Sequence, residues 1–226
     1  MFGYMNNRGI VMHADIKAVE KGYIIKGQEY VRVTEVMSVI RKKELEVWRG
    51  NIGNEEADRI LLEAQDTGTR VHLACEEILK GITTGFDIRI RDLDLQGIEI
   101  KMVENFQGWV NRNVKGVILL EEVVFSEKFR YAGRLDALVF LRDGKEVLID
   151  IKTTGAIYDE VALQLAAYKE ALKEMEIVGD DCRRMCVRLD KKTGSLEIRE
   201  FTGTQDFQAF LCCLGIYNWL KGGKNV

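Results

Sequence analysis

Hydrophobic and polar residues alternate with two different periods along the chain, and this change divides the sequence into two halves. In the first half, apolar residues recur mainly at helical spacing, and the helix ends carry capping and acidic residues. The exception is GYIIKGQEYVRV, which alternates with period two and predicts a hairpin. The elements predicted for this half are a hairpin around Gly27 and helices over 35–49 (N-capped by Thr34), 54–65, 69–81 and 97–114.

In the second half the pattern changes to period two and to β-branched residues. Three consecutive strands are predicted by GVILLEEVVFSE, YAGRLDALVFL and EVLIDIKT. A helix over 158–175 follows, then a hairpin made of CRRMCVRLD and SLEIREF, and finally a helix in DFQAFLCCLGIYNWL. The order helix, three strands, helix, strand predicts an α/β fold with a mixed central sheet that helices cover on both faces.

The composition of the chain limits its expected domain count, compartment and mode of nucleic-acid binding. The 226 residues, 46% hydrophobic and 31% charged, predict one domain over 1–226, with an N-terminal hairpin and helical extension (1–66), a core (67–190) and a C-terminal strand and helix (191–226). The five cysteines form no even framework, which favours a reducing compartment. Without a membrane-spanning run or a secretory signal, we expect a cytoplasmic protein, or one of the host cytoplasm if viral. A net charge of −3 confines nucleic-acid binding to local basic patches.

Charged residues interrupt the predicted strand pair GRLDALVFLRDGKEVLIDIKTTG. If residues 142–144 form a three-residue loop with Gly144 as a left-handed bulge, Leu141 pairs with Lys145. Counting back along the ladder then places Asp136 opposite Asp150. A two-residue Asp-Gly loop would shift the register by one residue and send these two acids to opposite faces.

In the first register Lys152 falls opposite Arg134 and shares the face of Asp136 and Asp150, because cross-strand partners point the same way. Two carboxylates this close repel, and a hard divalent cation such as Mg²⁺ suits their oxygens better than Lys152 alone. The alternative is a buried Asp–Lys ion pair that supports the sheet. The other face is apolar and is expected to be buried: Leu135, Ala137, Val139, Leu141, Val147, Ile149 and Ile151.

Four segments in this order resemble the RecB-like exonuclease branch of the PD-(D/E)XK nuclease superfamily. GTRVHLACEEIL is similar to the branch's histidine helix, GRLDALV to the motif with the first acid, LIDIKTT to the D-x-K motif, and LQLAAY to the Q-x-x-x-Y helix. The resemblance extends over residues 68–168 and implies a restriction-endonuclease-like core. The proline that usually precedes the first acid is replaced by Leu135.

The resemblance implies a site for Mg²⁺ or Mn²⁺. The implied ligands are His72, Asp136, Asp150 and the backbone carbonyl of Ile151, with Glu121 or the neighbouring Glu122 as a further acid. Lys152 would orient the attacking water and stabilise the phosphate. Gln164 and Tyr168, four residues apart on one helical face, would steady Lys152 or a substrate phosphate.

Several of these residues also have ordinary structural interpretations. A single histidine on a helix is more often structural than a ligand, Gln164 and Tyr168 can be interface residues, and His13 is expected to be solvated. Glu76, one turn after His72, can orient its ring or simply be an exposed charge. The apolar C-terminal helix is expected to be core or subunit interface.

The resemblance implies a Mg²⁺- or Mn²⁺-dependent deoxyribonuclease, most simply an exonuclease acting at DNA ends in recombination, repair or replication. A structure- or site-specific endonuclease and a catalytically silent DNA-binding module remain alternatives. We expect no iron–sulfur cluster, since the cysteines lack the branch's spacing: Cys75, Cys182, Cys186, Cys212 and Cys213. DNA is the expected partner, with no membrane, and a homo-oligomer or a recombination or replication protein as partner stays open.

Overall fold

The computed structural model describes residues 15–41 and 43–222, and His13, which we expect to be solvated, lies outside these ranges. The described residues form two five-stranded sheets and six α-helices. None of these helices is long and apolar enough to cross a membrane. The α/β class predicted from the sequence is therefore confirmed.

The larger sheet has the strand order β10-β9-β8-β7-β4 and is mixed. Its strands are β4 (Val114–Leu120), β7 (Ala137–Leu141), β8 (Glu146–Lys152), β9 (Arg183–Leu189) and β10 (Leu196–Glu200). β8 and β9 run parallel because helix α5 (Glu160–Glu174) provides the crossover between them, and the other neighbours are antiparallel. This is the mixed central sheet that the sequence predicts.

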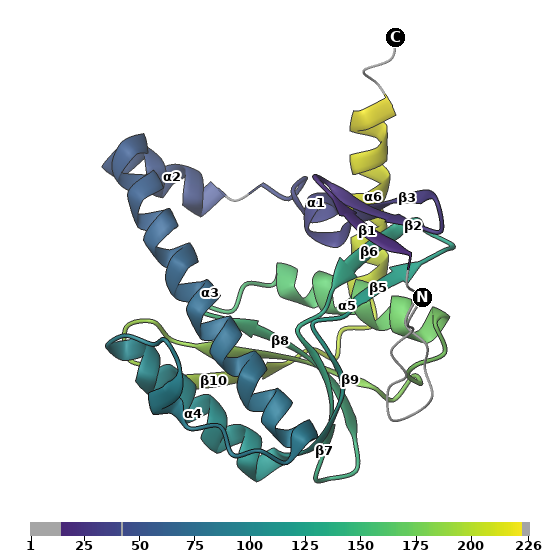
Figure 1. Ribbon diagram of the computed structural model, residues 1–226. Coiled ribbons are helices and arrows are strands. Elements are labelled where there is room, and N and C mark those ends of the chain that lie inside the picture. Colours follow the sequence, from purple (N-terminus) through teal and green to yellow (C-terminus); the bar gives the residue numbers. More distant parts are fainter. Residues whose placement is uncertain (1–14, 42, 223–226) are drawn as a thin grey trace.

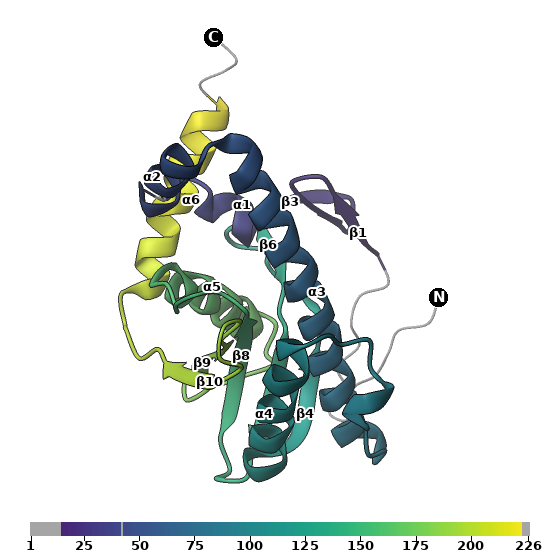
Figure 2. The same cartoon turned by 90° about the vertical axis from the view of Figure 1, so that its left-hand side faces the viewer.

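Helices cover both faces of the larger sheet (Figures 1 and 2). On one face, side chains of α3 (Asn54–Thr84) and α4 (Ile98–Asn113) form a core with Val139 and Ile149. On the other, α5 and α6 (Asp206–Gly222) form a core with Leu138 and Leu148. Burial on both faces explains why β7 and β8 are continuous apolar runs that only the charged positions interrupt.

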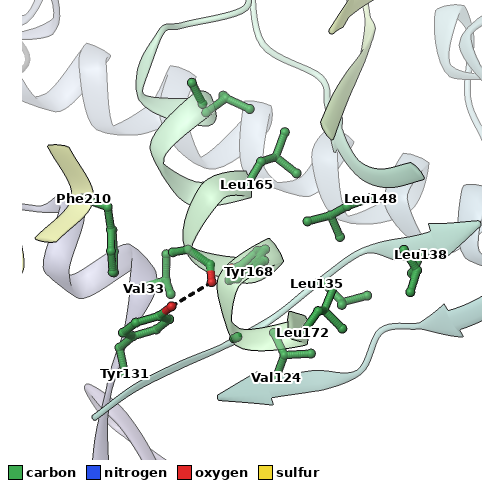
Figure 3. Close-up of a cluster of buried hydrophobic side chains, with 14 of the residues drawn as sticks. Val33, Val124, Tyr131, Leu135, Leu138, Leu148, Leu165, Tyr168, Leu172 and Phe210 are labelled. Carbon is green, nitrogen blue, oxygen red and sulfur yellow. Dashed lines mark hydrogen bonds between the residues drawn. The ribbon is translucent and has the colours of Figure 1, made fainter. Parts of the chain in front are cut away.

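The second core also contains the buried residues that connect the two sheets (Figure 3). Tyr131 of the smaller sheet is fully buried there, and its hydroxyl donates a hydrogen bond of 2.9 Å to the carbonyl of Ala167 in α5. A buried hydroxyl needs such a partner. Tyr131 therefore ties the smaller sheet to α5.

The smaller sheet has the order β1-β2-β3-β6-β5 and lies next to α1. Its strands are β1 (Ile16–Val19), β2 (Gly22–Ile25), β3 (Gln28–Arg32), β5 (Val123–Ser126) and β6 (Tyr131–Arg134), and α1 spans Val33–Met37. β2 and β3 form the predicted hairpin, with Lys26 and Gly27 both at positive φ in its turn. The smaller sheet thus joins the N-terminal hairpin to strands from the middle of the chain.

Two of the strands predicted as continuous are each divided between the two sheets, which corrects the predicted three-stranded meander. β4 ends at Leu120 and β5 begins at Val123, while β6 ends at Arg134 and β7 begins at Ala137. The two strands still pair in one antiparallel register through both sheets, from Ser126↔Tyr131 to Leu120↔Ala137. They form one long hairpin that bends at 121–122 and 135–136.

The pairing of β7 with β8 agrees with the register that the three-residue loop predicts. The Leu141 amide donates to the Lys145 carbonyl at 2.8 Å, Gly144 has φ 84°, and Ala137 lies opposite Ile149. Two details were wrong because the bend intervenes. Leu135 packs in the α5 core rather than with the apolar face, and Lys152 has no cross-strand partner at Arg134, which belongs to the other sheet.

The helix boundaries differ from the prediction in three places. The helix expected over 35–49 is two helices, because α1 ends where the Ser38 hydroxyl donates to the Glu35 carbonyl; α2 spans Lys43–Ile52. Thr34 is inside α1, whose N-cap is Arg32, so the predicted cap is wrong.

The helices predicted over 54–65 and 69–81 are a single helix, α3, that continues through Gly68 to Thr84. It ends at the left-handed Gly85, whose amide donates to the Gly81 carbonyl. A Cβ on Gly68 would lie 3.2 Å from the Thr153 hydroxyl, so this glycine allows close packing and is no break. Helices α4, α5 and α6 and the β9–β10 hairpin are as predicted to within a few residues.

Candidate metal and catalytic centre

The bend of the long hairpin brings two acidic residues next to each other. Glu121 has φ 53°, a left-handed conformation that a non-glycine residue rarely adopts, and its amide donates to the Asp136 carbonyl at 2.9 Å. On the far side of the bend the Leu135 amide donates to the Glu122 carbonyl at 2.9 Å. These two backbone bonds hold Glu121 beside Asp136.

Helix α3 brings a histidine to the same place. Its buried stripe, which includes Val71 and Cys75, packs against the larger sheet and leaves the half-buried His72 facing the bend. The His72 Nδ1 lies 4.0 Å from the Asp136 Oδ2. One ligand atom from each of His72, Glu121 and Asp136 lies within 4.8 Å of the others, which is close enough for the three to share one cation.

The backbone of β8 fixes the carboxylate of Asp136. Its Oδ2 accepts a hydrogen bond of 2.6 Å from the Ile151 amide. The bend is therefore tied to the end of β8 at this point. The role of the Ile151 carbonyl as a metal ligand stays a prediction.

Asp150 is the most deeply buried charge of the centre, with 2% of its side chain exposed. Its Oδ1 accepts a hydrogen bond of 2.7 Å from Lys152 Nζ. Its Oδ2 is buried and has no hydrogen-bond partner among the described residues. Burial, together with the charge of Asp136, raises the pKa of Asp150 to about 6, although Lys152 acts in the opposite direction.

Lys152 stays a cation in this environment. Burial lowers its pKa, but the negative charges of Asp150 and Asp136 outweigh burial, and the net effect is a pKa above the ordinary value. Its side chain reaches a cavity of about 440 Å³ that Gln164 also lines. The lysine is thus charged, held by Asp150 and open to a molecule in the cavity.

The structure distinguishes the two candidate glutamates. Burial, then the charges of Asp136 and Glu76, raise the pKa of Glu121 to about 7. Glu121, not Glu122, lies with His72 and Asp136, although burial raises the pKa of Glu122 as well. Glu76 forms an ion pair of 2.7 Å with Lys80, which favours a surface charge near the centre over a role in orienting His72.

Gln164 and Tyr168 lie on the helix face that the sequence indicates. The Gln164 Nε2 donates to the Tyr168 hydroxyl at 3.3 Å, and burial raises the pKa of Tyr168. The Tyr168 ring packs on Gly133, where an added Cβ would lie 2.5 Å from a ring carbon. Within the described residues neither side chain bonds to Lys152, so their role in steadying it stays a prediction.

Two buried cysteines beside the acids were not assigned a place in the centre from the sequence. Cys75 is one turn after His72, and burial followed by the charge of Asp136 raises its pKa well above the ordinary value. Cys186 pairs with Asp150 across β8 and β9, and burial with that charge raises its pKa to about 12. Both thiols are therefore neutral small residues behind the acids.

Sequence signals for two of these features exist. The i, i+3 spacing places Cys75 on the turn after His72. The neighbourhood of Glu121 and Asp136 follows from the hairpin register, since counting on from Val123↔Arg134 makes them partners. This register supports Glu121, which was named first from the sequence, over the alternative Glu122.

Comparisons with known proteins identify no family. No protein family and no curated protein matches the chain. Among solved structures, the crystal structure of SSO0001 is similar with 16% identity and a TM-score of 0.45, covering 87% of this chain and 78% of that one. A protein from Eubacterium rectale named "putative exonuclease" has 14% identity and a TM-score of 0.45, covering 71% of this chain and 69% of its own. Likenesses this distant do not assign a function to the chain.

Proposed function

We propose that this protein is a metal-dependent deoxyribonuclease, most simply an exonuclease, that hydrolyses phosphodiester bonds. One observation carries the proposal: Asp150, whose Oδ1 is held by the cation Lys152 and whose pKa is raised in part by the charge of Asp136, has a buried Oδ2 without a partner among the described residues. A folded protein rarely leaves such an atom unsatisfied unless a ligand completes it. The resemblance of the sequence motifs supplies the class of reaction.

The residues at the bend fit a hard divalent cation. Three ligand atoms from His72, Glu121 and Asp136 converge, and the unpartnered oxygen of Asp150 is a candidate fourth. Carboxylates with one imidazole suit Mg²⁺ or Mn²⁺ better than a soft metal. When bound, the cation would polarise the phosphate oxygens and lower the pKa of a bound water.

The chain's own residues have distinct tasks in this proposal. Lys152, held by Asp150, places a positive charge where it can neutralise charge that develops on the phosphate. The hydrogen bond from the Ile151 amide keeps the Asp136 carboxylate in one orientation before substrate binds. Gln164 of α5 lines the cavity beside the lysine and donates to the Tyr168 hydroxyl. Most of the centre is thus positioned by backbone and buried contacts, which keeps reorganisation during reaction small.

Digestion of matched DNA substrates tests the proposal. Linear single-stranded and double-stranded DNA and covalently closed circular DNA are incubated with Mg²⁺ or Mn²⁺, and the products are sized. We expect degradation of linear DNA, loss of activity in EDTA, and an intact circle. Cutting of the circle would favour the endonuclease alternative.

A pair of variants shows whether the bend is the site. Asp136→Asn should abolish cleavage and the thermal stabilisation that Mn²⁺ confers on the wild type. Asp143→Asn is the matched control, because Asp143 lies at the opposite end of the same strand pair and is exposed. Full activity in Asp136→Asn would contradict the site. A protein that binds Mn²⁺ through Asp136 and cleaves no DNA would be the silent module.

A further inference from the structure

Helix α2 carries apolar side chains that nothing in the described structure covers. The helix has no buried residue, and Leu45 and Val47 are exposed by 38% and 55%. Trp48 is only half-buried. Figure 1 shows α2 away from the two sheets and next to the beginning of α3. An exposed apolar surface of this kind commonly marks a binding site.

Two cavities connect this surface to the catalytic centre, and we call them together the α2 groove. The first, of about 440 Å³, is lined by Lys152 and Gln164. The second, of about 590 Å³, is lined by Trp48 and by Leu61 of α3. They share four lining residues, so they are adjacent: Ile40, Thr154, Tyr158 and Glu160. The volumes are those of ordinary ligand sites.

Tyr158 lies where the two cavities of the groove meet. Tyr158 lines both cavities and is 52% exposed. Its loop is fixed from below by Arg188, which donates to the carbonyls of Thr154 and Gly155 at 3.1 Å each. The Tyr158 ring is therefore presented on a supported loop, in the same groove as Trp48.

The charges of the groove fit a nucleic-acid strand whose bases enter it. The Arg41 guanidinium is paired with Glu46 at 2.7 Å. Lys191 lines the second cavity together with Arg41 and is therefore the cation that can meet a backbone phosphate there. Glu44 and Glu160 line it as well and oppose phosphate inside it, which leaves the apolar and aromatic surface for a base. Bases of a duplex have no free face for aromatic rings, whereas unpaired bases stack on them.

We propose that the α2 groove binds an unpaired stretch of the substrate strand, with a base stacked on Trp48 and Tyr158 while the strand leads to Lys152. This inference rests on the proposed nuclease function and makes single-stranded DNA, or an opened end, the substrate class. Continuity with Lys152 favours a strand over a second copy of the chain as the occupant.

Strand binding in EDTA tests the inference without cleavage. Anisotropy of a labelled oligothymidine strand is compared with that of a blunt hairpin duplex of similar length. We expect tighter binding of the single strand by the wild type, and a loss of about 10-fold or more in Trp48→Ala and in Tyr158→Ala. Trp48→Phe keeps an aromatic face and should restore most of the affinity.

Trp219→Ala is the matched control, because Trp219 is exposed by 74% on α6 and lines neither cavity. Equal strand affinity in Trp48→Ala, Tyr158→Ala and Trp219→Ala would overturn the inference, as would equal binding of the blunt duplex. If Trp48→Ala lowers the melting temperature, Tyr158→Ala gives the same test from a surface loop. A wild-type dimer on gel filtration that Trp48→Ala dissociates would assign the groove to a second copy and also overturn it.

The two proposals fail separately. If the protein cleaves DNA in a metal-dependent way and Trp48→Ala does not change strand binding, the proposed nuclease function is retained and the proposed role of the groove is rejected. Loss of strand binding in Trp48→Ala, in a protein that cleaves no DNA with Mg²⁺ or Mn²⁺, retains the groove and removes the nuclease.

Discussion

Two ion pairs of nearly equal burial differ in how completely they are satisfied. The carboxylates of Glu99 and Asp150 are 4% and 2% exposed, and their partners Arg70 and Lys152 are 29% and 27% exposed. Both oxygens of Glu99 accept hydrogen bonds, from the Arg70 guanidinium and from the Gln96 amide. Among the described residues, Asp150 finds a partner only for Oδ1.

This difference appears in the pKa values of the two acids. The Arg70 hydrogen bonds lower the pKa of Glu99, against the effect of burial. Burial raises the pKa of Asp150 to about 6, and Lys152 does not offset it. The Arg70–Glu99 pair is complete as folded and joins α3 to α4, whereas the Lys152–Asp150 pair leaves one carboxylate oxygen for a cation or donor. The number of hydrogen bonds to each carboxylate thus distinguishes the structural Arg70–Glu99 pair from the Lys152–Asp150 pair, for which we propose a function, without reference to any motif.

The largest effect is expected on the rate of DNA cleavage when the Lys152–Asp150 pair is disrupted. Asp150→Asn should lower kcat for DNA cleavage by about 10³-fold or more, because several kcal/mol of charge stabilisation at the phosphate depend on this carboxylate and its lysine. Single-turnover digestion of end-labelled DNA measures it. Cleavage within a few-fold of the wild type would contradict the role given to Asp150.

The structural pair should respond in stability instead. Glu99→Gln leaves Arg70 without its anion and should lower the free energy of unfolding by about 2–3 kcal/mol, less than for a fully buried pair because Arg70 reaches solvent. Urea unfolding measures the change. Glu104→Gln, at an exposed position of the same helix, is the control and should be near neutral. A large drop in kcat of folded Glu99→Gln would show that the two pairs are not separable.

A smaller effect on stability is expected at Gly133, on which the Tyr168 ring packs. Gly133→Ala would place a Cβ 2.5 Å from the Tyr168 ring, which is buried and cannot move freely, so we expect a loss of about 1–3 kcal/mol. Thermal unfolding measures it. Gly116→Ala, in the same hairpin but with open space around the added atom, should change stability little. Equal melting temperatures for the two variants would mean that the Tyr168 ring is mobile.

The proximity of Asp150 and Lys152 was predictable from the sequence, but the missing partner of the second Asp150 oxygen was not. The three-residue loop fixes the β7–β8 register as far as Ala137 opposite Ile149, and Asp150 and Lys152 follow on β8. Asp136 lies just beyond the end of this ladder and is held there by the hydrogen bond from the Ile151 amide. Whether the second oxygen of Asp150 finds a donor depends on tertiary neighbours, which no local pattern specifies. The Arg70–Glu99 pair was not predicted for a related reason, since its residues lie 29 positions apart on two helices.

The bend of the long hairpin was also not predictable from the periodicity of apolar residues. The bend falls within the segments GVILLEEVVFSE and YAGRLDALVFL. Neither segment has a proline or glycine at the bend itself, and the left-handed position is occupied by Glu121. Propensity opposes such a residue there, and two backbone hydrogen bonds and the packing of both sheets overcome it. Conversely, Gly68 signals a helix end, yet packing against Thr153 carries α3 through it.

The smallest effect concerns Glu121 in the metal-free protein. Its pKa is raised from 4.5 to about 7, so the folded state favours the protonated form. That stabilisation is fully present below the ordinary pKa and is lost as the pH rises through about 7, because between these values the folded protein holds a proton that the unfolded chain has released. Glu121→Gln cannot ionise, so its melting temperature in EDTA should gain on the wild type between pH 5 and pH 8. A difference between Glu121→Gln and wild type that does not change with pH would contradict the raised pKa of Glu121.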